Sequence, residues 1–497
     1  MERRAKIVAT VGPASSDEVV LARLLRAGAD VLRLNMSHGD HPGHRRTIET
    51  IRRVSAELGK HVPVLLDLMG PRFRLGALAE PRLLRRGERV TLGADPGEVD
   101  LPVDDPGFLR HLQQGERVLI ADGLVALQVL AKSARRVTAR VVDGGSVSTR
   151  KGINLPDSSI PFTISAKDRA DLAFAVAERA DYLAGSYIGR ARDVEALRAA
   201  VRALGDDIPL VAKLERAVAV EHIDEIVASA DAVMVARGDL GVEVPLHQVP
   251  VLQKRIIAAG RRAGKPVIVA TQMLESMIAQ PRPTRAETSD VANAVFDGAD
   301  ALMLSGETAA GRFPVEAVRT MARIVVEAES YRLKQLADGA RPSEPAPAAD
   351  ELAASSRRDP EALAAGGAIE IADVVADAAV HAASKLDGSL IVAFSQGGFT
   401  ARRLARYRPV VPTLVFTTDE RVARRIQLLW GTRPIRLERE VQHRDDLIEV
   451  VERELLIRRL IRPGECIILL MGYPIQDRPL TNLLRIHRVA ERSGRRA

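Results

Sequence analysis

The chain has 497 residues, of which 46% are apolar and 28% charged, a balance that is typical of globular proteins and excludes a disordered one. At roughly 150 residues per domain, this length predicts about three domains. The single cysteine, Cys466, excludes an intramolecular disulfide framework and a cysteine-based metal cluster, and it fits a reducing compartment.

The formal net charge of +7 raises the question of a nucleic-acid partner. Only 3% of the residues are aromatic, so little material is present for stacking on single strands, and no nucleic-acid motif is found. No apolar run approaches the roughly 20 residues of a membrane span, and the first apolar stretch is too short and too early for a signal peptide. We therefore expect a cytoplasmic protein without a nucleic-acid or membrane partner.

Eight short runs rich in β-branched residues alternate with segments of helical spacing in the first two thirds of the chain. Near-continuous apolar strands between helices indicate a parallel sheet buried on both faces, and eight such units predict a closed (β/α)8 barrel over 1–70 and 161–336. The runs are Lys6–Gly12, Val31–Ser37, Val62–Leu68, Tyr182–Ile188, Pro209–Glu215, Ala232–Asp239, Pro266–Thr271 and Ala301–Gly306.

The helical pattern is interrupted over 71–160. Short alternating runs appear there instead, separated by Asp-Gly and Asp-Gly-Gly turn signals, and they predict a small β domain inserted between the third and fourth barrel strands. The clearest of these runs are Arg89–Leu92, Arg117–Ile120 and Arg136–Val142.

The composition turns to Ala, Pro, Ser and Glu over 337–369, which predicts a flexible linker with at most one short helix. Apolar runs then return at Leu390–Phe394, Thr413–Phe416 and Cys466–Met471, with helical segments between them. They predict a separate open α/β domain over 370–497.

Polar side chains follow most of the predicted barrel strands. Barrel enzymes build their sites where the strands end, and six polar strand ends at one mouth are hard to explain by chance, although a single one is more often structural. The residues are Arg33, Asn35, Ser37 and His38 where the second run ends, Asp67 where the third ends, Lys213 and Glu215 at the end of the fifth, Arg237, Gly238 and Asp239 at the end of the sixth, Thr271 at the end of the seventh, and Ser305 and Glu307 at the end of the eighth.

Two of these carboxylates suit a divalent cation. Glu215 and Asp239 offer hard oxygen ligands that leave positions open for substrate oxygens, as Mg²⁺ prefers. Lys213 points to the same mouth as Glu215 and can neutralise charge on a phosphoryl group or an enolate, although an ion pair of these two residues could simply fill the barrel end. Arg33 offers a planar fork for phosphate or carboxylate. The set predicts metal-assisted chemistry on a small phosphorylated anion.

Several ordered motifs make the sequence similar to the pyruvate kinase family over essentially its whole length. They are Lys6–Ser16, Arg33–Gly39, Met234–Glu243, Ala270–Met277, Pro281–Glu287 and Met303–Ala309. The resemblance implies phosphoryl transfer from phosphoenolpyruvate to ADP, giving pyruvate and ATP. It also implies that the inserted domain is a small β-barrel lid that closes over the site and that the protein is a homotetramer.

The resemblance also implies a role for each residue of the mouth. Arg33 contacts the transferring phosphoryl group, Lys213 stabilises the enolate, and Glu215 and Asp239 hold Mg²⁺ or Mn²⁺, with the Gly238 backbone beside them. Thr271 lies next to the methylene carbon that is protonated, and Ser305 and Glu307 are members of the proton route. Substrate binding falls to Arg33, Lys213, Gly238, Asp239 and Thr271, and nucleotide binding to Asn35, His38, Arg74 and Lys151, where a purely structural His38 is an equal alternative.

The same resemblance gives a monovalent cation site made of Asn35, Ser37, Asp67 and Leu68. Relatives that need K⁺ carry a glutamate at a nearby position, and relatives that do not need it carry a lysine. This chain has Arg72 there, and a fixed guanidinium can supply the charge that K⁺ brings. We therefore expect activity that does not require K⁺.

Some positions depart from the family pattern. Arg216 replaces a usual asparagine or lysine, and Gly189 replaces a usual arginine. In the C-terminal domain Ser395–Arg402 resembles an effector loop that could cradle a phosphorylated ligand, but Gly398-Phe399 and Leu480 depart from the usual residues.

Two alternatives remain open from the sequence. One is a catalytically altered paralogue with a regulatory or binding role, which the retention of Arg33, Lys213, Glu215, Asp239 and Thr271 argues against. The other is a Mg²⁺-dependent barrel lyase or aldolase acting on 2-oxo acids, which the inserted domain and the third domain disfavour.

Overall fold

The computed structural model describes residues 3–71, 73–105, 107–158, 160–337, 360–386, 389–438, 444–473 and 480–490. Its centre is a closed barrel of parallel strands in the order β1-β17-β16-β15-β14-β13-β3-β2. The strands are β1 (Lys6–Val11), β2 (Val31–Asn35), β3 (Val64–Asp67), β13 (Tyr182–Gly185), β14 (Leu210–Leu214), β15 (Ala232–Ala236), β16 (Val267–Ala270) and β17 (Ala301–Leu304). Each of the eight runs expected from the sequence contains one of these strands, so the barrel prediction is confirmed.

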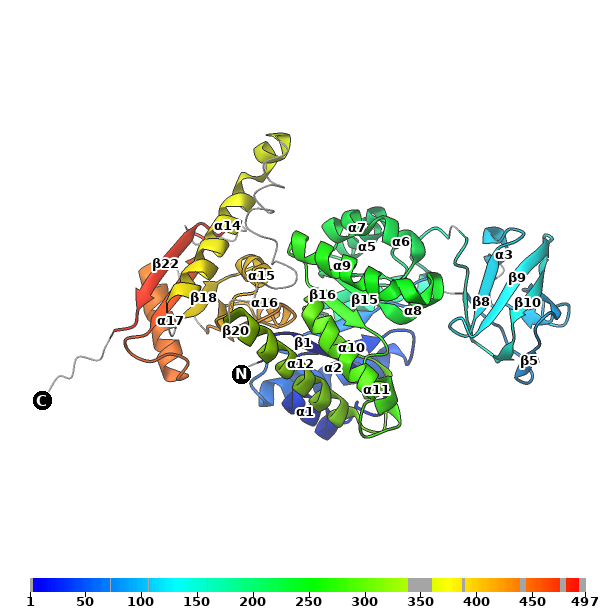
Figure 1. Cartoon of the computed structure of the whole chain (residues 1–497), viewed down its shortest axis with the longest axis horizontal. Helices are drawn as coiled ribbons and strands as arrows, with labels where there is room; N and C mark the ends of the chain where they lie inside the picture. The colour runs from blue at the N-terminus through cyan, green and yellow to red at the C-terminus, as the bar shows by residue number, and fades with distance from the viewer. Residues whose placement is uncertain are drawn as a thin grey trace, which may run out of the picture.

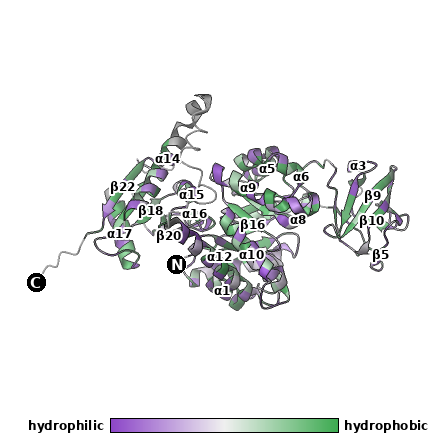
Figure 2. Cartoon of the chain, viewed as in Figure 1, coloured by the Kyte–Doolittle hydropathy of each residue, from purple (hydrophilic) through white to green (hydrophobic). Residues whose placement is uncertain are grey.

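Helices surround the barrel (Figure 1). They are α1 (Glu18–Ala27), α2 (His41–Glu57), α4 (Ala166–Ala177), α5 (Ala191–Ala203), α6 (Ala217–Glu221), α7 (Ile223–Ser229), α8 (Arg237–Glu243), α9 (Val249–Ala263), α10 (Arg285–Asp297), α11 (Gly306–Ala309) and α12 (Pro314–Ala337), with 3-10 turns η1 (Leu246–Gln248) and η2 (Glu275–Ile278). One core lies between helices and strands, and a second fills the barrel interior. The strands accordingly carry the apolar colour in Figure 2.

Local signals set where the helices begin. Asp17 caps α1 by accepting from the amides of Val19 and Val20, and α10 starts with a capping box in which Thr284 and Glu287 satisfy each other's amides. Each such cap stabilises a helix by about 1 kcal/mol. One expected strand end is wrong, because the chain turns into α8 at Arg237 and Asp239 therefore lies in the first turn of a helix.

The inserted domain follows β3 and lies at one end of the molecule in Figure 1. Its elements are β4 (Phe73–Arg74), β5 (Arg82–Leu84), β6 (Arg89–Gly93), β7 (Leu101–Pro102), α3 (Phe108–His111), β8 (Arg117–Ile120), β9 (Val125–Lys132), β10 (Arg136–Asp143), β11 (Gly145–Val147) and β12 (Gly152–Asn154). Seven strands form a sheet in the order β4-β12-β8-β9-β10-β6-β7. A bridge between Leu75 and Val103 joins its two edges, so the sheet closes around its own core.

The C-terminal domain lies at the opposite end of the barrel (Figure 1). Its elements are α14 (Pro360–Lys385), β18 (Leu390–Phe394), α15 (Phe399–Arg406), β19 (Thr413–Thr417), α16 (Glu420–Ile426), β20 (Thr432–Arg436), α17 (Arg444–Ile457), β21 (Cys466–Met471) and β22 (Leu483–Arg488). The sheet order is β20-β19-β18-β21-β22, and only the β21–β22 pair is antiparallel. The expected linker falls mostly on 338–359, outside the described residues, and its last ten positions belong to α14 instead.

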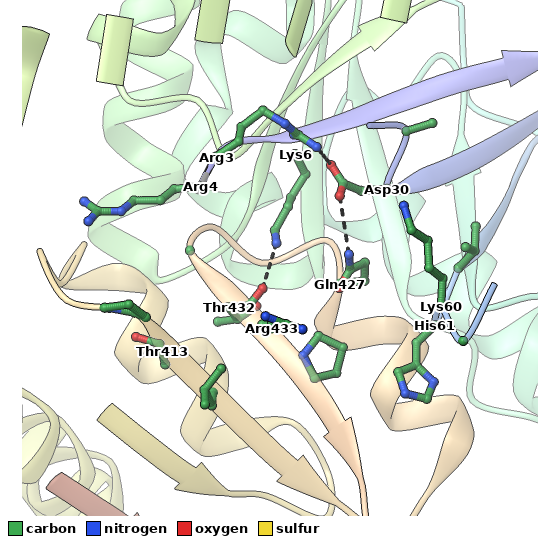
Figure 3. A pocket seen from close by; sticks show the side chains of 17 residues that line it. Arg3, Arg4, Lys6, Asp30, Lys60, His61, Thr413, Gln427, Thr432 and Arg433 are labelled. Carbon is green, nitrogen blue, oxygen red and sulfur yellow. Dashed lines mark hydrogen bonds and ion pairs between the residues drawn. The ribbon is translucent and has the colours of Figure 1, made fainter. Parts of the chain in front are cut away.

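The C-terminal domain packs on the barrel end opposite the strand ends that carry the polar residues. Leu428 is fully buried in the cluster that fills the barrel interior, and Lys6 Nζ donates to the Thr432 carbonyl at 2.7 Å (Figure 3). A cavity of about 480 Å³ lies at this junction. Cationic side chains that line it include Arg3, Arg4, Lys6, Lys60 and Arg433.

Candidate active site

The mouth of the barrel holds a buried network of opposite charges. Arg33, in the middle of β2, donates to Asp67 Oδ2 from Nε at 2.7 Å, and its Nη1 donates to the Thr10 hydroxyl at 3.0 Å. Asp67, at the end of β3, also lies 3.3 Å from Lys213 Nζ on β14. Burial alone raises the pKa of Asp67, but Lys213 and Arg33 outweigh it and hold that pKa below its usual value. Asp67 is therefore an anion that aligns two cations.

Lys213 is the centre of this network. Its Nζ lies 3.3 Å from both Asp67 Oδ1 and Glu215 Oε2 and donates to the Ser186 hydroxyl at 2.6 Å. Burial lowers the pKa of Lys213, but the carboxylates of Asp67, Glu215 and Asp239 outweigh this effect, so its pKa is raised. The ion pair of Lys213 with Glu215 expected at the barrel end is thus present, and the surrounding carboxylates favour the charged form of Lys213.

Glu215 and Asp239, the two residues expected to hold a divalent cation, lie close enough to influence each other's charge. Glu215 is buried, and its Oε1 accepts from the Tyr187 amide at 2.6 Å, whereas its Oε2 has no hydrogen bond among the described residues. Burial raises the pKa of Glu215 to about 7, and the nearby Asp239 adds to that rise. A bound cation relieves both effects. No cluster of three or more His, Cys, Asp or Glu residues that could hold a metal exists in the described ranges.

Thr271 lies directly after β16 and contacts the start of α8. Its hydroxyl accepts from the Gly238 amide at 2.6 Å and donates to the Ala270 carbonyl at 2.5 Å. The structure therefore brings together Gly238 and Thr271, which were both expected in substrate binding.

Ser305 and Glu307 lie on the neighbouring strand end. Glu307 is fully buried, and its two oxygens accept from the amides of Ser305 at 2.7 Å and Leu274 at 3.1 Å. Glu307 thus joins the segment after β16 to the segment after β17.

A cavity of about 780 Å³ opens beside Arg33. Asn35, His38 and Ser305 also line it, so part of the expected nucleotide and proton-route residues share one space. The other two nucleotide residues lie in the inserted domain and are not among the lining residues of this cavity. They are neighbours there, since Arg74 Nη1 donates to the carbonyl of Arg150, the residue before Lys151.

The expected monovalent cation site is described only in part. Asn35 Oδ1 accepts from the Ser37 amide at 3.1 Å, and Asp67 and Leu68 are buried nearby on the next strand. Arg72, the expected substitute for K⁺, lies outside the described residues.

Gly189 and Arg216, the two barrel residues that depart from the usual family pattern, follow neighbouring strands β13 and β14 and lie close together. Arg216 is buried, and its Nη1 donates to the carbonyl of Ile160, where the chain returns from the inserted domain. A Cβ atom on Gly189 would lie 3.7 Å from that same Nη1. The guanidinium of Arg216 therefore reaches the space where a side chain at position 189 would begin.

Two residues of the site, Ser186 and Arg237, are not predicted from the sequence. Ser186 follows the fourth strand as the other site residues follow theirs, which is the signal that could have identified it. Arg237 lies at a predicted strand end, but its residue type alone indicates no role there. In the structure its Nη2 donates to the Thr271 carbonyl.

The expected effector loop lies at the start of α15. The Thr400 hydroxyl is 2.8 Å from the Thr481 hydroxyl, and both side chains are buried. Gln396 Oε1 is buried without a hydrogen-bond partner among the described residues. Separately, no helix in the described part of the chain is long and apolar enough to cross a membrane.

Comparisons with known proteins agree with this arrangement. The family model for the pyruvate kinase barrel domain matches residues 2–318, and that for the pyruvate kinase alpha/beta domain matches 373–487. A pyruvate kinase of Mycobacterium tuberculosis is 41% identical over 496 residues, covering 99% of each chain. One from Agrobacterium vitis is 40% identical over 495 residues, covering 98% of this chain and 97% of the relative. One from Geobacillus stearothermophilus is 37% identical over 504 residues, covering 99% of this chain and 81% of the relative. With both domains and the buried charge network of the mouth in place, the chain belongs to the pyruvate kinase family and is a phosphotransferase.

Proposed function

We propose that the mouth of the barrel transfers the phosphoryl group of phosphoenolpyruvate to ADP, giving pyruvate and ATP. The observation that carries this proposal is the buried network of Arg33, Asp67, Lys213 and Glu215, because it fixes two cations and two carboxylates in one place. Phosphoryl transfer depends mostly on such positioning and on electrostatic stabilisation.

The reaction is divided among residues of this chain. The bond between phosphorus and the bridging oxygen of phosphoenolpyruvate breaks, its electron pair stays on the enolate oxygen, and a β-phosphate oxygen of ADP bonds to phosphorus. Arg33 holds the phosphoryl group, and the Lys213 ammonium stabilises the enolate oxygen. The methylene carbon then takes a proton beside Thr271, with Ser305 and Glu307 around it, and pyruvate results.

Glu215 and Asp239 would hold Mg²⁺ or Mn²⁺. A divalent cation at this place neutralises charge on substrate oxygens and helps to orient them. The fit rests on the buried Glu215 Oε2, which has an ion pair with Lys213 but no hydrogen bond among the described residues, and on the raised pKa of that carboxyl, which a cation would relieve.

The nucleotide would bind in the cavity beside Asn35 and His38. Arg74 and Lys151 reach the phosphates if the inserted domain closes as a lid, which also excludes water. The match to both pyruvate kinase domains speaks against a barrel lyase or aldolase.

A coupled assay for pyruvate tests the proposal. The protein is supplied with phosphoenolpyruvate, ADP and Mg²⁺, and Lys213→Met, which loses the ammonium, serves as the control after circular dichroism has verified its fold. Turnover by the wild type that exceeds this control supports the transfer reaction. Equal rates for the two proteins would refute it.

The same assay tests the expected independence from K⁺. We propose that Arg72 supplies the charge, so replacing K⁺ by tetramethylammonium at constant ionic strength leaves the rate unchanged. A large stimulation by K⁺ would refute this part alone. An effector bound at Ser395–Arg402 and a homotetramer are further expectations, tested by activation with sugar phosphates and by sedimentation.

A further inference from the structure

Two adjacent residues of the active site have a strained backbone. Thr271 has φ +70° and Gln272 has φ +56°, which places both in the left-handed region. That region is uncommon for residues other than glycine and is a genuine outlier for a β-branched residue such as threonine. Strain of this kind persists only when the surroundings enforce it, and it concentrates at functional sites.

The guanidinium of Arg237 supplies the restraint. Its Nη2 donates to the Thr271 carbonyl at 2.8 Å and to the Gln272 carbonyl at 3.4 Å. Its Nη1 donates to Asp290 on α10 at 2.8 Å. The side chain of Arg237 is only 11% exposed, and its bond to the Thr271 carbonyl is partly buried, whereas Asp290 is 38% exposed. The planar guanidinium of Arg237 therefore links the carbonyls of both left-handed residues, Thr271 and Gln272, to helix α10.

The restraint determines where the Thr271 hydroxyl lies. That hydroxyl bonds to the amide of Gly238, the residue that follows Arg237 on α8. Arg237 thus holds the backbone carbonyl of Thr271, and Gly238, which follows Arg237 in the chain, holds the Thr271 hydroxyl. If the segment after β16 relaxed to an ordinary conformation, both its carbonyls and the hydroxyl would move.

We propose that Arg237, oriented by Asp290, is a positioning residue for the proton-transfer half of the reaction. It keeps residues 271 and 272 in the left-handed conformation that places the Thr271 hydroxyl beside the carbon that is protonated. The inference rests on the proposed function, but it concerns a different side chain and a different step from those that bind the phosphoryl group.

The first test is Arg237→Lys, which keeps the charge but replaces the two separate nitrogens, one bonded to Asp290 and the other to the carbonyls, with a single shorter-reaching nitrogen. We expect kcat to fall roughly tenfold or more, because the strained conformer is no longer enforced. The KM for phosphoenolpyruvate should stay within about twofold, because Arg33 and Lys213 are untouched. Asp290→Asn, which leaves the guanidinium in place but loosens it, should give a smaller fall.

The second test isolates the proton step. Exchange of the pyruvate methyl protons in D₂O, followed by NMR with Mg²⁺ and ATP present, should slow at least as much as overall turnover in Arg237→Lys. Guanidinium ion at low millimolar concentration should restore part of the kcat of Arg237→Ala, since it can reoccupy the vacated fork. An arginine that only stabilises the fold would not show this rescue.

Arg198→Lys is the matched control. Arg198 likewise joins a carboxylate, Asp231 at 2.9 Å, to a backbone carbonyl, that of Ser229 at 2.9 Å, but at the opposite end of the barrel. It should lower the unfolding midpoint without changing kcat or methyl exchange. Unchanged kcat and exchange in Arg237→Lys and Asp290→Asn would overturn the inference, as would a change in KM alone. A wild type without turnover would instead refute the proposed function.

Discussion

Asp67→Asn tests whether the charge network of the mouth is what aligns its cations. Asp67 is 1% exposed and accepts from Arg33 at 2.7 Å while lying 3.3 Å from Lys213. The amide keeps the shape but removes the negative charge. Removing one partner of a buried ion pair costs about 3–5 kcal/mol of unfolding free energy. Lys213 retains Glu215 and Ser186, so we expect the lower end, about 3 kcal/mol.

The pH dependence of this loss has a definite sign. The pKa of Asp67 is lowered in the folded protein, so its stabilising effect is fully present above the unfolded pKa of about 3.9. The effect disappears as the pH falls through the folded pKa. The difference in stability between wild type and Asp67→Asn should therefore be full at neutral pH and shrink under acid conditions.

Urea unfolding and steady-state kinetics measure the two effects separately. We expect a lower midpoint with an unchanged slope, and a fall in kcat of roughly a hundredfold as Arg33 loses its alignment. The control is Asp181→Asn, because Asp181 is equally buried and joins Arg52 and Arg424 at 2.8 Å each, at the other end of the barrel. It should lose similar stability and keep its kcat. Asp67→Asn with unaltered midpoint and rate would refute the reasoning.

Three further predictions concern the same mouth. Because burial raises the pKa of Glu215 to about 7, and a metal binds only the carboxylate, Mn²⁺ affinity by calorimetry should weaken about tenfold per pH unit below that value; a constant Kd between pH 6 and 8 would contradict this. Ser186→Ala should reduce kcat several-fold and lower the unfolding midpoint, since it removes the buried hydroxyl that accepts from Lys213 and donates to the Leu68 carbonyl; wild-type kinetics would show the bond to Lys213 to be dispensable for turnover. Arg216→Ala should lower the unfolding midpoint, and adding Gly189→Arg should recover part of it; no recovery would mean that the shared space is coincidental.

The barrel is readable from the sequence because each strand is a short apolar run buried on both faces. β20 is different, since Thr432–Arg436 contains two exposed arginines and Pro434, which an edge strand tolerates but a propensity argument rejects. The sixth predicted run extends too far, to Asp239, whereas β15 ends at Ala236. Helix α8 begins at Arg237 without a capping side chain, so no local signal marks its start.

The site was predictable to the extent that position along a strand determines it. Lys213 and Glu215 alternate on and just beyond β14, so their convergence follows from the pleat. The roles of Ser186 and Arg237 depend on hydrogen bonds to residues 27 and 34 positions away, which no local pattern records. The left-handed backbone conformation of Thr271 cannot be predicted from the sequence either, since a β-branched residue rarely adopts it.

Leu428 of the C-terminal domain completes the apolar cluster that fills the barrel interior. If the C-terminal domain detached, water would enter the barrel interior, so the two should melt in one cooperative transition, whereas the inserted domain has a core of its own. Trp430, the single tryptophan, lies two residues further on, with Arg4 and Arg408 5.4 and 4.7 Å from its ring. The chain therefore carries a built-in fluorophore at this joint, and its emission reports docking of the two domains without any label.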